Sequence, residues 1–255
     1  MKPLQTNFSV YKKFSFENPP IAIKYLFFKP EGIEPLGKSL ALCEMLKEAH
    51  QRKKPFYVTG EDENCFGKTF LGMAGNSPHF SDGGELGILF KIFQEPRNNV
   101  RLRQFAYNIE PGVVNYIVFS PLDKLTFEPD LLLLMANTGQ AEILLRAMTY
   151  STGEMYESKS TFIGGCSWLY AYPYLTGKVN FMVTGLAFGM KSKRVFPEGW
   201  LLISIPYQWL PTITQNLGKM DWVLPSYNMG SDDFLKYEKR LIGELVQKAK
   251  NSTKK

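Results

Sequence analysis

The sequence predicts an α/β or α+β protein with a mixed β-sheet flanked by helices. Short β-branched and aromatic segments recur along the chain, segments with helical periodicity lie between them, and both strand–helix and strand–strand neighbours occur. No linker separates these segments. We therefore expect one compact, two-lobed unit.

Six segments predict strands. Residues 21–28 (IAIKYLFF) are rich in β-branched and aromatic side chains. Residues 131–135 are continuously apolar, which is typical of a strand buried on both faces. The other predicted strands are residues 55–59, 112–122, 179–186 and 200–205.

The helices are predicted from apolar residues that recur every three or four positions. In residues 38–53, this spacing makes one stripe of Leu42, Met45, Leu46 and Ala49. Thr138 is expected to cap a helix over residues 140–149. Further helices are expected at residues 65–75, 82–93, 209–217 and 234–250, whereas residues 97–103 read as a basic loop.

These elements suggest three parts. Residues 1–18 are expected to form a leader, residues 19–235 a single domain with a lobe boundary near 107–112, and residues 236–255 a basic helix and tail. The net charge is +6, and the last part holds seven basic and two acidic residues. The rest of the chain is almost neutral, which argues against a nucleic-acid partner.

The chain has no apolar stretch of the roughly 18 to 20 residues that a membrane span requires. The first 25 residues lack the apolar run and cleavage site of a signal peptide. We expect a cytoplasmic protein with reduced thiols and no membrane partner. The sequence leaves open whether the protein forms a homo-oligomer.

The three cysteines, Cys43, Cys65 and Cys166, are candidate metal ligands. Cys65 and Cys166 follow loop residues at the expected starts of helices, where backbone N–H groups favour a thiolate and lower the thiol pKa. Three thiolates can hold a [4Fe–4S] cluster with one iron open to another ligand or to a substrate. The competing interpretation is that the cysteines pack as small hydrophobic residues.

Other residues suggest a ligand site. Arg101 and Arg103 are candidate contacts for a small anionic substrate. Trp168 and Tyr170 begin an aromatic group that is a candidate pocket wall. The alternative for the arginines is a solvated loop, and the alternative for the aromatic group is packing in the core.

Three functions follow from these candidates. The first is redox or Lewis-acid chemistry at an iron–sulfur cluster. The second is a non-enzymatic module that binds a small molecule in an aromatic pocket. The third is an enzyme with Cys65 or Cys166 as its nucleophile. No catalytic residue is assigned, and the sequence leaves open whether the protein is an enzyme.

Eight segments carry a resemblance to a known family. They are PPIAIKYLF, PEGI, LCEMLKEA, PFYVTGEDENCFGKTFLGM, FSPLDKL, EPDLLLLMANTGQAEILLRA, GGCSW and GWLLISIPYQWLP. Over residues 19–218 the chain resembles the uncharacterised prokaryotic family called domain of unknown function 169. The resemblance implies cysteines at the positions of Cys43, Cys65 and Cys166, and it implies no activity, substrate or cofactor.

Overall fold

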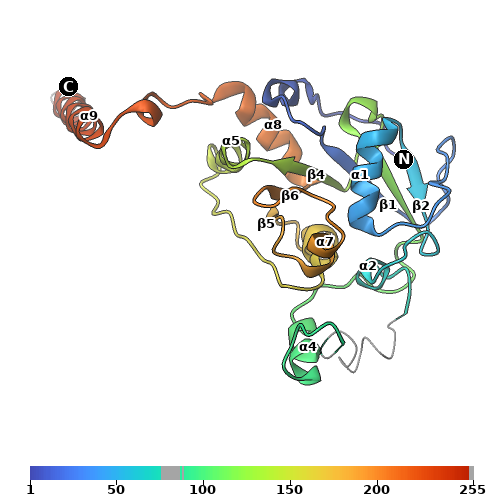
Figure 1. The fold of residues 1–255 in the computed structure, drawn as a ribbon. Coiled ribbons are helices and arrows are strands. Elements are labelled where there is room, and N and C mark those ends of the chain that lie inside the picture. Colours follow the sequence, from blue (N-terminus) through green and yellow to red (C-terminus); the bar gives the residue numbers. More distant parts are fainter. Residues whose placement is uncertain (76–86, 88, 253–255) are drawn as a thin grey trace. The chain divides into compact units, whose positions relative to one another are not determined.

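The computed structural model describes residues 1–75, 87 and 89–252. Its centre is a six-stranded sheet in the order β2-β3-β1-β4-β6-β5 (Figure 1). The strands are β1 (Ile21–Leu26), β2 (Phe56–Val58), β3 (Tyr116–Pro121), β4 (Leu131–Ala136), β5 (Asn180–Val183) and β6 (Leu201–Pro206). The longer helices are α1 (Leu42–Arg52), α4 (Pro96–Arg103), α5 (Thr138–Thr149), α8 (Leu210–Lys219) and α9 (Ser231–Ser252). Shorter ones are η1 (Ser9–Phe14), α2 (Gly67–Phe70), the π-helical η4 (Ser167–Ala171), α6 (Tyr172–Thr176) and α7 (Phe188–Ser192).

The predicted α/β or α+β class is confirmed. The five pairs of neighbouring strands named above are all antiparallel. Within the described ranges, parallel pairing appears as single bridges beside β2, which join Pro35 to Tyr57 and Leu40 to Glu63. The expected mixture of strand directions is therefore limited to this edge, and the α+β description fits best.

One face of the sheet carries the larger core. Side chains alternate along each strand, so Ile21, Ile23 and Tyr25 of β1 point to the same face. This face packs against α1, which contacts β1 and β3 (Figure 1). It also packs against η4, which contacts β5 and β6. β4 is buried along its whole length, as its apolar run predicted.

The opposite face is covered by α5, which contacts β4 and β6. The amide of Gln140 donates to the Phe14 carbonyl at 3.0 Å, and that of Asn216 donates to the Ala147 carbonyl at 2.8 Å. These bonds tie η1 and α8 to α5. The sheet is thus sandwiched between helices, and the candidate site belongs to the α1 and η4 side.

Three sequence predictions need correction. α1 begins at Leu42, not at residue 38, because the N–H groups of Leu36 and Leu40 bond to carbonyls near β2 and keep that segment extended. Asn137, not Thr138, caps α5 through a bond from the Gln140 N–H at 2.9 Å. The basic residues 97–103 belong to a helix that Pro96 begins.

Contacts between Cα atoms divide the chain into two units, Met1–Gly218 and Lys219–Lys255. Residues 107–112 lie inside the first unit. The helix expected at residues 82–93 falls mostly outside the described residues. In the described part of the chain, no helix is long and apolar enough to span a membrane.

Candidate three-cysteine site

The three cysteines line one cavity of about 260 Å³. Cys43 is in the first turn of α1, and Cys65 lies two residues before α2. Cys166 directly precedes the π-helical turn η4. Such turns are frequent at functional sites, because they re-aim side chains within a helix. The fold therefore brings together three thiols from distant segments of the sequence.

Glycines allow this close approach. A Cβ atom on Gly67 would lie 2.6 Å from Leu42 Cδ1 and 3.2 Å from the Cys166 sulfur. Gly164 has a positive φ of 74°, and a Cβ there would lie 3.0 Å from the Phe70 ring. A larger residue at either position would push apart the segments that carry the cysteines.

The buried carboxylate of Glu63 connects the segments of Cys43 and Cys65. One oxygen accepts the Leu42 N–H at 3.4 Å. The other accepts the N–H groups of Cys65 at 3.1 Å and Lys68 at 3.2 Å. Burial raises the pKa of Glu63, while these N–H groups act in the opposite direction. Glu63 thus fixes the starts of α1 and α2 relative to each other.

Tyr170 connects the segments of Cys43 and Cys166. It follows Cys166 by one helical turn, and its hydroxyl donates to the Leu42 carbonyl at 3.2 Å. The Tyr25 hydroxyl in turn donates to the Tyr170 carbonyl at 3.3 Å. Both tyrosines are buried. Two polar side chains, Glu63 and Tyr170, therefore hold all three cysteine segments.

Burial dominates the electrostatics of the thiols. Burial first and proximity to Cys65 second raise the pKa of Cys43 to about 12. The pKa values of Cys65 and Cys166 are also raised by burial, and that of Cys166 is raised next by Cys43. The expectation that helix starts lower the pKa values of Cys65 and Cys166 is wrong, because burial raises both values, and at Cys65 it outweighs the N–H groups of Phe66 and Gly67.

The cavity walls are largely aromatic. Apart from the cysteines, its large side chains are those of Phe66, Phe70, Phe90, Phe162, Ile163, Phe188 and Met190. Among the described lining residues, Lys193 is the one charged side chain, and its ammonium lies 3.2 Å from a Glu44 carboxylate oxygen. Sequence reasoning missed Lys193, since it stands in an ordinary basic surface stretch, KSKR.

The other predicted contact residues lie elsewhere. Arg101 and Arg103 belong to α4, and neither lines the cavity. Trp168 and Tyr170 are buried in the protein interior, and the Trp168 indole N–H donates to the Thr161 hydroxyl at 2.7 Å. None of these four residues therefore lines the cavity, although Tyr170 lies close to the thiols of Cys43 and Cys166.

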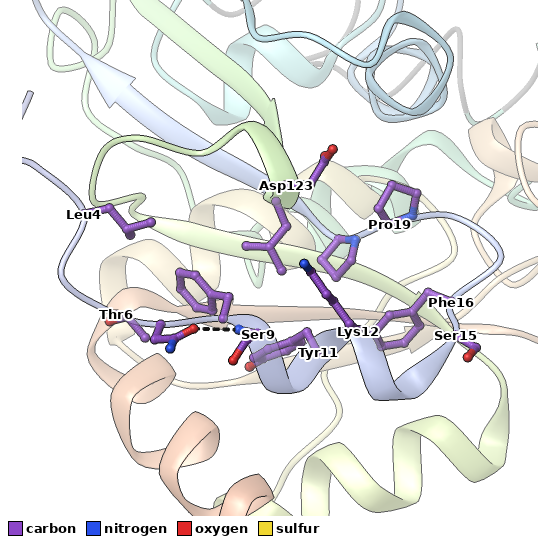
Figure 2. A pocket seen from close by; sticks show the side chains of 13 residues that line it. Leu4, Thr6, Ser9, Tyr11, Lys12, Ser15, Phe16, Pro19 and Asp123 are labelled. Carbon is purple, nitrogen blue, oxygen red and sulfur yellow. Dashed lines mark hydrogen bonds between the residues drawn. The ribbon is translucent and has the colours of Figure 1, made fainter.

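No group of three or more His, Cys, Asp or Glu side chains in the described part of the chain has the arrangement of a metal site. A larger hollow of about 550 Å³ lies beside η1 (Figure 2). It is lined by Lys12, Asp123 and several apolar residues, and Figure 2 shows Lys12 extending from η1 toward it. No thiol is among its described lining residues, so the three-cysteine cavity is the better candidate for chemistry.

The comparisons define the family. A model of the DUF169 family, described as "Uncharacterised ArCR", matches residues 9–216, so the chain belongs to this family. The chain is 25% identical over 204 residues to the uncharacterized protein MJ0308 of Methanocaldococcus jannaschii. The aligned region covers 78% of this chain and 86% of that relative. No solved structure matches the chain. The family thus agrees with the resemblance seen in the sequence, and it assigns no activity.

Proposed function

We propose that the three-cysteine cavity binds a [4Fe–4S] cluster through Cys43, Cys65 and Cys166. The observation that carries the proposal is that the chain's three cysteines line one apolar cavity. Thiolates are the usual ligands of such clusters, and three of them leave one iron open. We place the protein in the reducing cytoplasm, where the thiols stay available.

The donor set fits this group. A cluster binds its thiolates on three different irons, so its ligands stand further apart than the roughly 3.8 Å between sulfurs around a single zinc ion. Three thiols that line one cavity and belong to separate segments are compatible with this wider spacing. The electrostatic coupling of the thiols also fits, because each raises the cost of ionising the next until a cation is bound.

The cavity suits a small group better than a large ligand. Pockets for drug-sized molecules usually exceed about 300 Å³. When bound, a cluster supplies electron transfer or, at its open iron, Lewis-acid chemistry. The chain itself supplies aromatic walls that exclude water and one ammonium, Lys193, that can attract an anionic substrate group.

Anaerobic reconstitution tests the proposal. The reduced protein is incubated with iron and sulfide, desalted, and examined by absorption spectroscopy. We expect a broad band near roughly 400 nm for the wild type, which C43S, C65S and C166S lose or weaken strongly. S192A, a change at the cavity wall outside the thiols, keeps the band. Equal band intensity in all five proteins would rule out the proposed ligands.

The aromatic walls also favour a second candidate, a module that binds a small apolar molecule without a cluster. It predicts that a folded C43S/C65S/C166S variant still binds indole as wild type does, and that F188S weakens this binding. Indole binding unchanged by F188S would exclude this cavity as the indole site.

A further inference from the structure

The C-terminal helix α9 has an apolar stripe along one side. Phe234, Leu235, Leu241, Ile242, Leu245 and Val246 recur at helical spacing and are all exposed. No residue of α9 is buried. The helix has 22 residues and a length of about 33 Å, and the stripe from Phe234 to Val246 extends over about 18 Å of it. A stripe of this length marks an interaction surface.

The charges at the two ends of α9 indicate what covers this stripe. Asp232 and Asp233 lie in the first turn, and Lys248 and Lys250 lie near the end. This polarity favours the helix itself through its dipole. It also makes one end of the helix complementary to the other end of an identical helix.

From these observations we propose that α9 pairs with α9 of a second copy of this chain in antiparallel orientation. Asp232 and Lys250 are separated by 18 residues, or five turns of about 3.6, so they lie on the same side of the helix. In an antiparallel pair, each Asp232 meets Lys250 of the other copy along that side. A parallel pair would instead place like charges together.

A membrane surface fits this helix less well. Interfacial helices have polar faces rich in Lys and Arg. Within α9, five basic residues are offset by four acidic ones: Lys236, Lys239, Arg240, Lys248 and Lys250 against Asp232, Asp233, Glu238 and Glu244. Glu238 also lies within the apolar stripe, where an anionic membrane would repel it.

Light scattering after size-exclusion chromatography of the full chain tests the interface. We expect the wild type to be a dimer at tens of micromolar and L245D to be a monomer with an unchanged far-ultraviolet spectrum. Q247D, a change on the side of α9 opposite the stripe, stays dimeric. A monomeric wild type, or a dimeric L245D, would overturn the proposal.

Charge exchange tests the orientation. We expect D232K and K250D each to weaken the dimer several-fold, since each creates two repulsive pairs at the rim. The double variant D232K/K250D recovers wild-type affinity. No recovery would contradict the antiparallel arrangement. Binding of monomeric wild type to vesicles of phosphatidylcholine and phosphatidylserine, abolished by L245D, would show a membrane to be the occupant and would also overturn the proposal.

Discussion

The hydroxyl of Tyr170 donates a hydrogen bond of 3.2 Å to the carbonyl of Leu42, the residue before Cys43. Because Tyr170 also lies one turn after Cys166, this single bond connects two of the three cysteine segments. It crosses from η4 to the start of α1, and both groups are buried. The relative positions of two thiols therefore depend on one phenol.

Replacement of Tyr170 by Phe removes this bond and keeps the ring. We expect a loss of about 1 kcal/mol in the free energy of unfolding, since a typical buried hydrogen bond contributes that much. Urea unfolding measures the change. We also expect Y170F to lose a reconstituted cluster faster than wild type does. Y172F is the matched control, because the buried Tyr172 hydroxyl has no hydrogen-bond partner among the residues that the structure describes. A similar loss in both variants would contradict the role given to Tyr170.

Glu63 offers a second test of how the site is held. Glu63→Ala leaves three backbone N–H groups without their acceptor, so we expect a loss of about 3 kcal/mol in unfolding free energy. Glu63→Gln retains part of the acceptor capacity and should lose less. Glu61→Gln, an exposed neighbour, should change stability by less than about 0.5 kcal/mol. If E63A were as stable as E61Q, the carboxylate would not hold these segments.

The metal-free protein should lose stability in alkali through Cys43. Its pKa is raised from 9.0 to about 12 in the folded state, so the unfolded chain releases the proton first as the pH rises. The protonated Cys43 thiol therefore contributes its full share of folded-state stability below about pH 9, and this share is lost between pH 9 and 12. Unfolding under reducing conditions measures this effect. Between pH 8 and pH 10.5, we expect the free energy of unfolding to fall by about 2 kcal/mol more in wild type than in C43A. Parallel pH profiles for both proteins would refute this.

Acid should act through His50. Burial lowers its pKa from 6.5 to about 4, although the Pro19 backbone acts in the opposite direction. The unfolded chain therefore takes up the proton first, and stability is lost as the pH falls from about 6.5 to 4. His50 is partly exposed, and solvent screening reduces the effect, so we expect the free energy of unfolding to fall by about 2 kcal/mol over this range. H50Q removes this component, and an unchanged acid profile in H50Q would assign the loss to other groups.

The sequence predicts the strands well for a physical reason. Apolar runs such as residues 131–135 have few alternatives to a buried strand, and β4 occupies Leu131–Ala136. The start of α1 was missed because backbone bonds from Leu36 and Leu40 to distant residues override the local helical pattern. Local patterns cannot reveal such long-range bonds.

The residues of the candidate site likewise include some that the sequence identifies and some that it does not. Its three cysteines were identifiable, because the chain contains no others. Lys193 and Glu63 were not, since a lysine in a basic stretch and a glutamate in an acidic loop resemble solvated residues. Their roles depend on where the fold places them. The raised thiol pKa values likewise follow from burial, which spacing does not disclose.

The most direct test of the central claim is the iron and sulfide content of protein purified without oxygen. We predict about four irons and four sulfides per chain in the wild type, as a single [4Fe–4S] cluster requires, and far less in C166S. A colourless, iron-free wild-type protein that also fails to take up iron and sulfide would contradict the claim that the three cysteines are cluster ligands.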